Sequence, residues 1–228
     1  MHVLAKNSAR EAFRSSRWVM LTVLILAYVC SNVDRMAITL LIEPIKAHFG
    51  ASDGQIGLLQ GVAFTLVYSV VGLPAGRLID RSRRVTIIAI AIVGWSVMTS
   101  FCGLAPTFLL LFIGRGGVAI GEAALMPGAY SLIADGFNVK RQGVVVSLYQ
   151  AAGGLGAGLA LAVGGGLLQR LGRDGAIEVP LIGSLAPWQI AFLGLGLPGL
   201  LVAALLASLA EPERKMYASG GGRLAWFG

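Results

Sequence analysis

The chain has 228 residues, of which 56% are apolar and only 13% are charged, and its formal net charge is +7. Soluble domains carry about 25% charged residues, so the composition excludes an ordinary soluble domain. The mean hydropathy of +0.79 and the 32 glycines are typical of helices that pack closely in lipid. Cys30 and Cys102 both lie in apolar stretches, and we interpret them as small buried side chains without a disulfide or metal role.

Six apolar segments are each long enough to cross a bilayer, which needs about 20 helical residues. In chain order they are 18–42, 55–79, 85–105, 108–134, 142–169 and 187–209. Runs of this length favour helices over the alternating strands of a transmembrane barrel. We therefore predict an all-α polytopic membrane protein, with a cytoplasmic segment at 1–17, a six-helix bundle at 18–209 and a flexible cytoplasmic tail at 210–228.

The basic residues predict the direction in which each helix crosses. Twelve of the 18 Lys and Arg lie in the N-terminal segment, in the loops at 80–84 and 135–141 and in the C-terminal tail, whereas three lie in the opposite loops. Because Lys and Arg accumulate on the cytoplasmic side, we expect both termini in the cytoplasm and the protein in a bacterial inner membrane. The cations are dispersed over separate short loops, which argues against nucleic acid as a partner.

Four ionisable residues interrupt the first and fourth apolar segments: Asp34, Arg35, Arg115 and Glu122. A charge in the bilayer interior costs several kcal/mol unless it finds a partner or water, so such residues usually mark a pathway or a binding site. Asp34 and Arg115 each lie about seven residues, or ~10 Å, from the outer ends of antiparallel helices. We expect these two residues to pair, and the pattern leaves open whether the pair is a structural lock or part of a site.

Glu122 lies two turns deeper than Arg115 on nearly the same helical face. The sequence offers no cation at the level of Glu122, and we interpret this carboxyl as a carrier of a proton or a cation. Arg35 is offset from Asp34 by about 100° around the helix, so it faces either the same cavity or another helix. The first and fourth segments would be equivalent helices of two inverted three-helix repeats, and such helices form the sites of carriers.

The turn after the second segment carries an ordered string of glycine, aspartate and arginines. The residues Gly76-Arg77-Leu78-Ile79-Asp80-Arg81-Ser82-Arg83-Arg84 resemble the G-x-L-x-D-R-x-G-R-K signature of the major facilitator superfamily. Arg83 stands where that signature has glycine, and Val85 stands where it ends in a cation. The resemblance implies that Gly76, Asp80, Arg81 and Arg84 belong to a cytoplasmic gate.

Two further elements resemble the Spinster-like branch of this superfamily. Residues Asn32-Val33-Asp34-Arg35 resemble its N-x-x-D-R element, and residues 115–123 resemble its R-G-x-x-G-I-G-E-A element; the likeness spans residues 28–137. It implies one half of a major facilitator fold, built as a 3+3 inverted repeat, in a secondary carrier that works by alternating access. It also implies a lysophospholipid or sphingosine-1-phosphate as the first substrate to consider.

The same resemblance assigns roles to individual residues. Asp34, Arg35, Arg115 and Glu122 would be the charges of the cavity, with an arginine meeting an anionic head group and Glu122 coupling protons. The further candidates for lining the cavity are Asn32, Tyr68, Tyr130, Tyr149 and Gln150. In the fifth segment, Gly154-x-x-x-Gly158 predicts close packing of helix backbones.

The expected partners are membrane lipid, a small-molecule or lipid substrate, and a further six-helix half. The superfamily pairs two such halves, so we expect this chain to be a truncated half or to pair with a second copy. The alternatives are a non-transporting fragment that acts by interaction, or a carrier for a drug, sugar or organic acid. An enzyme is not expected, because His2 and His48 lie outside the spans and no catalytic motif is present. We likewise expect no cofactor and no metal.

Overall fold

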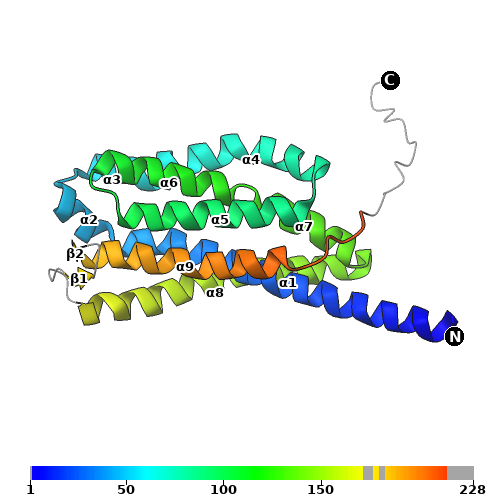
Figure 1. Ribbon diagram of the computed structural model, residues 1–228. Helices are drawn as coiled ribbons and strands as arrows, with labels where there is room; N and C mark the ends of the chain where they lie inside the picture. Colours follow the sequence, from blue (N-terminus) through cyan, green and yellow to red (C-terminus); the bar gives the residue numbers. More distant parts are fainter. Residues whose placement is uncertain (1, 172–176, 180–182, 215–228) are drawn as a thin grey trace, which may run out of the picture.

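The computed structural model describes residues 2–171, 177–179 and 183–214, and its helices run side by side as one bundle (Figure 1). The elements are α1 (His2–Leu40), α2 (Ile42–Phe49), α3 (Asp53–Gly57), the π-helix η1 (Leu58–Val62), α4 (Ala63–Arg81), α5 (Arg84–Gly103), α6 (Phe108–Glu122), α7 (Leu125–Gly136), α8 (Val139–Leu171), β1 (Ile177–Val179), β2 (Gly183–Leu185) and α9 (Pro187–Ala207).

Among the described residues, six helical stretches are long and apolar enough to cross a membrane. They are Arg17–Leu40, Asp53–Arg81, Arg84–Gly103, Phe108–Gly136, Val139–Ala162 and Pro187–Ala207. These stretches match the six predicted segments closely, so the all-α, six-span prediction is confirmed. The predicted segment 1–17 continues α1 as helix from His2 onward. Most of the predicted tail, 215–228, lies outside the described residues.

Two spans are interrupted where the sequence predicts continuous helices. The second span consists of α3, η1 and α4 in direct succession. The fourth span breaks at Ala123 and Ala124, immediately after Glu122. Pro127 lies in the first turn of α7 and cannot donate a hydrogen bond to the carbonyl of Ala123, which explains why the helix changes direction there.

A short antiparallel hairpin is the one non-helical element of the described chain, and the sequence analysis missed it. Strands β1 and β2 pair Ile177 with Leu185 and Val179 with Gly183. Gly183 has a φ of 96°, a left-handed conformation that glycine adopts without strain. The hairpin lies at the end of the bundle that also holds α2 and α3 (Figure 1); we call this the α2 end. The opposite end, where α4 turns into α5, is called the α4–α5 end.

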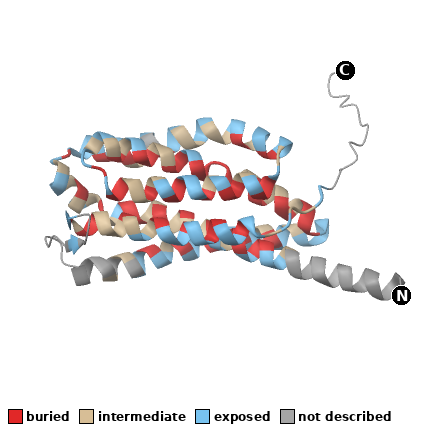
Figure 2. Cartoon of the chain, in the orientation of Figure 1, coloured by how far each residue is buried: buried red, intermediate tan, exposed pale blue. Residues whose placement is uncertain are grey.

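Buried side chains lie on the inward faces of the helices, and exposed ones cover the outside (Figure 2). One apolar cluster, which includes Leu24, Ile92 and Trp95, fills most of the bundle. A second cluster, which includes Trp188 and Phe192, fills the α2 end. Cys102 is fully buried and Cys30 partly buried, both as free thiols, in agreement with their interpretation as small core side chains.

Small residues let α5 and α9 approach closely. A Cβ atom added at Gly196 would lie 2.6 Å from the carbonyl oxygen of Ser96 and would also strike the Ser100 hydroxyl. On the other side of the bundle, α8 meets α1 through Gly153 and Gly156, which face Tyr28 and the backbone of Val29. The prediction for Gly154 and Gly158 is wrong, because these glycines have open space around them; the contacting face of α8 is shifted by one or two positions.

A short turn between α2 and α3 closes the α2 end. Lys46 Nζ lies 2.5 Å from Asp53 Oδ1, and the hydrogen bond to this carboxylate raises the pKa of Lys46. Ser52 begins α3 with a capping box, in which its hydroxyl accepts from the Gln55 N–H and the Gln55 side chain accepts from the Ser52 N–H. Both pairs are exposed, so they shape the turn and add little stability.

The contact at Gly196 yields a test of the packing. We expect Gly196→Ala to lower the stability of the purified protein by about 1–3 kcal/mol, because the methyl group would push α9 away from α5. Gly194→Ala on the same helix is the matched control, since its Cβ would meet nothing within 4 Å. Thermal unfolding in detergent measures the difference, and equal melting temperatures for the two variants would contradict this account of the α5–α9 contact.

Candidate functional site

Two ion pairs, one buried and one partly buried, join α1 to α6 in the middle of the bundle. The Asp34 carboxylate on α1 accepts a hydrogen bond from Arg115 Nη1 on α6, at 2.8 Å. Thr99 on α5 donates to the other oxygen of Asp34, at 3.1 Å. All three side chains are buried. The expected pair between Asp34 and Arg115 is therefore present, and a third helix supports it.

The expectation that Glu122 has no cation at its own level is wrong. Arg35 Nε donates to Glu122 Oε2 at 2.6 Å, and the Ser31 hydroxyl donates to the same oxygen at 2.8 Å. The physical reason is the direction of helical side chains, which tilt toward the N-terminus of their helix. Because α1 and α6 are antiparallel, the long side chain of Arg35 reaches along α1 toward Glu122, and Asp34 meets Arg115 nearer the other end.

Each ion pair keeps one polar atom free of hydrogen bonds. Within the described residues, Glu122 Oε1 and Arg115 Nε are buried and have no hydrogen-bond partner. An unpartnered buried polar atom costs about 1–3 kcal/mol. The site therefore offers one acceptor and one donor that a proton, a water molecule or a ligand can satisfy.

Aromatic rings of α4 cover the two arginines. The guanidinium carbon of Arg35 lies 4.7 Å from the centroid of the Phe64 ring and 4.8 Å from that of Tyr68. The guanidinium carbon of Arg115 lies 5.4 Å from the Phe64 centroid. Contacts of this kind contribute about 0.5–2 kcal/mol each, depending on desolvation. Arg35 is the accessible member of the network, since 32% of its side chain is exposed while Glu122 is fully covered.

The remaining candidates for lining the cavity lie in different surroundings. Tyr149 is fully buried, stacked on Tyr28 at 4.7 Å and perpendicular to Tyr130 at 6.0 Å. Tyr68, Tyr130 and Asn32 are half-buried, and Gln150 is exposed. Asn32 donates to the carbonyl oxygen of Tyr28 on its own helix. The structure therefore brings Tyr68 to the charged network and packs Tyr149 into the core.

A second charged network lies at the α4–α5 end and centres on Arg84. This arginine is 1% exposed, pairs with Asp135 of α7 and donates from Nε to Glu211 Oε1 at 2.9 Å. The Glu211 carboxylate also accepts from the backbone N–H groups of Arg84 and Val85, at 3.0 and 2.9 Å. It thus caps the first turn of α5, where the helix dipole favours a negative charge.

The other three predicted gate residues take no part in this network through their side chains. Asp80 and Arg81 are exposed, and a side chain at Gly76 would meet nothing within 4 Å. Arg214 instead binds the end of α4, because its guanidinium donates to the carbonyl oxygens of Ile79, Asp80 and Ser82. The described part of the predicted tail is therefore anchored.

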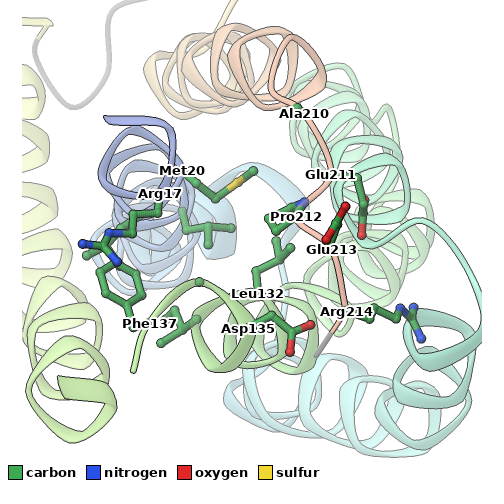
Figure 3. A pocket seen from close by; sticks show the side chains of 14 residues that line it. Arg17, Met20, Leu132, Asp135, Phe137, Ala210, Glu211, Pro212, Glu213 and Arg214 are labelled. Atoms are coloured by element: carbon green, nitrogen blue, oxygen red, sulfur yellow. The ribbon is translucent and has the colours of Figure 1, made fainter. Parts of the chain in front are cut away.

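A cavity of about 480 Å³ opens beside this second network. It lies between α1, α7 and the segment after α9, with Asp135, Glu211 and Glu213 on one side and Arg17 beside Phe137 on the other (Figure 3). The guanidinium of Arg17 lies 5.5 Å from the centroid of the Phe137 ring. The Arg84 network thus forms one wall of a hollow at the α4–α5 end.

Several network residues escaped the sequence analysis. Ser31 lies one helical turn before Asp34 and Arg35, so the i, i+3, i+4 spacing could have revealed it. Phe64 lies four residues before Tyr68 and could have been found in the same way. Thr99, Asp135 and Glu211 gave no signal of this kind, because their importance depends on which helices are neighbours.

Comparison with known proteins decides the family. The family model described as Major Facilitator Superfamily matches residues 24–226. The chain belongs to this superfamily. It is an integral membrane protein whose relatives are transporters and not enzymes, and both resemblances stated from the sequence are confirmed.

Individual relatives agree with this placement. An MFS-type efflux pump of Mycolicibacterium smegmatis is 31% identical over 189 residues, covering 83% of this chain and 41% of the relative. The mouse sphingosine-1-phosphate transporter SPNS2 is 34% identical over 152 residues, covering 66% and 28%. The inward-facing, occupied crystal structure of a bacterial homolog of the human lysosomal transporter Spinster superposes with a TM-score of 0.79 at 35% identity, covering 88% and 46%. The chain thus spans less than half the length of these relatives.

The energy of the contact between Asp34 and Arg115 can be measured. In a double-mutant cycle of Asp34→Asn and Arg115→Gln, we expect a coupling energy of about 0.5–3 kcal/mol in the unfolding free energy, measured by denaturant titration in mixed micelles. The exposed pair Lys46 and Asp53, cycled with Lys46→Gln and Asp53→Asn, should give about 0–1 kcal/mol. Strictly additive effects at Asp34 and Arg115 would show that the contact carries no energy.

Proposed function

We propose that this chain forms a six-helix half of a secondary active carrier, which moves a small amphipathic or anionic solute across the membrane by alternating access. The first substrate to test is a lysophospholipid. The observation that carries the proposal is the pairing of Arg35 with Glu122, since it places an accessible cation next to a fully buried carboxylate within the membrane. Such groups usually serve a transport pathway.

The pairing supports a simple exchange of partners. A proton that binds to the free oxygen of Glu122, Oε1, would neutralise the carboxyl and weaken its hold on Arg35. The guanidinium would stay above the rings of Phe64 and Tyr68, ready to bind the phosphate of an anionic head group. Loss of the proton on the other side of the membrane would restore the ion pair and displace the solute.

The second ion pair supports a different role. Asp34 and Arg115 are both buried, with side-chain exposures of 4% and 3%, and Thr99 adds a bond from α5. A pair with this little access holds α1 and α6 together during the exchange at Arg35. Its geometry is suited to fixing the helices, and Arg115 Nε remains as a donor toward the pathway.

The exposure of Arg35 also supports a partner. In lipid, a guanidinium that is one-third exposed would face acyl chains at considerable cost. We infer that a second six-helix unit, either a further half or a second copy, covers the open side of α4 and α1 and encloses water there. Large apolar side chains of α4 such as Leu66, Val70 and Leu73 are exposed on the outside of the bundle, as expected of a surface for lipid or for another helix.

An exporter of a different small molecule, such as a drug that is a lipophilic cation, is the second candidate, because the Mycolicibacterium smegmatis relative is named an efflux pump. Competition separates the two candidates. An anionic lysolipid should be displaced by a phosphate-bearing competitor that meets Arg35, whereas a lipophilic cation should not be.

The role of Glu122 can be tested directly. We expect Glu122→Gln to abolish the dependence of lysophosphatidylglycerol uptake on a proton gradient in proteoliposomes, because glutamine mimics the protonated carboxyl and cannot release a proton. Glu43→Gln, at an exposed carboxylate of α2, is the control and should keep that dependence. If the proton dependence survives in Glu122→Gln, the coupling role of Glu122 is wrong, whatever the substrate.

The proposed orientation puts the α4–α5 end in the cytoplasm of a bacterial inner membrane, since the bias of basic loops favours it. In a background without Cys30 and Cys102, a membrane-impermeant maleimide should label Ala47→Cys on intact cells and should spare Arg83→Cys until the membrane is opened. Both positions are exposed at opposite ends of the bundle. Labelling of Arg83→Cys from outside would reverse the orientation.

A further inference from the structure

Two adjoining hollows at the α4–α5 end share the residue Arg83. The first, of about 430 Å³, is a groove between α5 and α9, lined by Ala89, Ile90, Val93, Leu200 and Ala204 among others. The second, of about 600 Å³, lies above the α4–α5 turn and includes Arg81, Arg83, Glu213 and Arg214. Arg83 lines both, so the apolar groove adjoins a basic residue at this end.

The groove lies within the membrane-spanning parts of α5 and α9. Its lining extends from Arg83, the residue that precedes α5, to Val93, ten positions further on, which is ~15 Å along a helix axis. Ile90, Val93 and Ala204 are exposed on this face, and the α9 side of the groove includes the small residues Ala203 and Ala207. The groove therefore offers an apolar channel about half a hydrocarbon layer long.

The charge at the mouth of the groove favours an anion. Arg83 is exposed and has no ion pair among those found in the described chain. Arg84, its neighbour, is committed to Asp135 and Glu211. The N–H groups that begin α5 are occupied by the Glu211 carboxylate, so the helix terminus is not free to bind an anion and the arginine side chains must do so.

We propose that this groove binds a phospholipid of the adjacent leaflet, with its phosphate on Arg83 and one acyl chain between α5 and α9. The apolar channel alone would also suit another helix, but a charged group at the level where head groups lie fits an amphipathic lipid better. Basic pockets at the ends of membrane helices bind lipid head groups in this manner. This site is separate from the Arg35–Glu122 pair and would regulate or stabilise the carrier.

Acidic residues near the groove restrict the charge of the head group that can bind. Glu213 lines the upper hollow and Asp80 is exposed nearby at the end of α4, so a head group carrying several negative charges would be repelled. A single phosphodiester fits the local balance of charge, because the exposed Arg81 and Arg83 both line the same hollow. Arg214 is already bound to three backbone carbonyl groups.

The test measures lipid binding by the purified protein. Native mass spectrometry during titration with phosphatidylglycerol gives the apparent Kd of the tightest lipid, and a diazirine in the acyl chain maps its contacts. We expect Arg83→Gln to weaken binding about fivefold, and Ala204→Phe to weaken it comparably by filling the groove. Arg141→Gln and Ala151→Phe, at exposed positions of α8, are the matched controls and should leave the Kd unchanged.

The outcomes separate the possible causes. Adducts concentrated on 86–93 and 200–207, lost in Ala204→Phe, support the proposal. Equal loss of binding in Arg83→Gln and Arg141→Gln would overturn it in favour of general attraction to a basic surface. Displacement of the lipid by free glycerol phosphate would show that the acyl chain adds no affinity, and the proposed lipid site would be wrong. A groove filled by another copy of the chain would appear as a dimer that Ala204→Phe disrupts, with no localised lipid adduct.

Discussion

The fold is organised around the need to pair four charges inside a membrane. Asp34 with Arg115 and Arg35 with Glu122 form two ion pairs between α1 and α6, at places where unpaired charges would oppose insertion of these helices. The pairs lock the relative height of α1 and α6, because neither arginine can slide along its neighbour without losing its carboxylate. Thr99 and Ser31 extend the constraint through hydrogen bonds, and Phe64 bridges the two arginines.

The two ends of the bundle are built differently around these ion pairs. At the α2 end, α1 turns at Leu41 into α2, and aromatic side chains close the core. At the α4–α5 end, the break after Glu122 lets α7 leave the axis of α6 and carry Asp135 to Arg84. Glu122 of the first network and Asp135 of the second thus lie on the two parts of one interrupted span. A change in the angle between α6 and α7 would move Glu122 relative to Asp135 and so affect both networks.

Hydropathy and charge placement were enough to predict the six spans and the pairing of Asp34 with Arg115, because both follow from counting residues along helices of known rise. The partner of Glu122 was missed because a residue count ignores how far an arginine reaches and in which direction. The assignment of Arg84 to a cytoplasmic gate stays a prediction, and its partners Glu211 and Asp135 were not predicted, since they are 127 and 51 residues away from it in the chain. Helix periodicity also could not reveal which glycines of α8 contact α1.

The π-helix at Leu58–Val62 has a consequence for how such sequences can diverge. A π-helical turn contains one residue more than a turn of α-helix. One residue corresponds to about 100° of rotation around the helix axis. Deleting a single codon there would restore regular winding while swinging Phe64 and Tyr68 away from Arg35. Homologous chains that differ by one position in this stretch should therefore place different side chains above that guanidinium, even where every other residue of the span is the same.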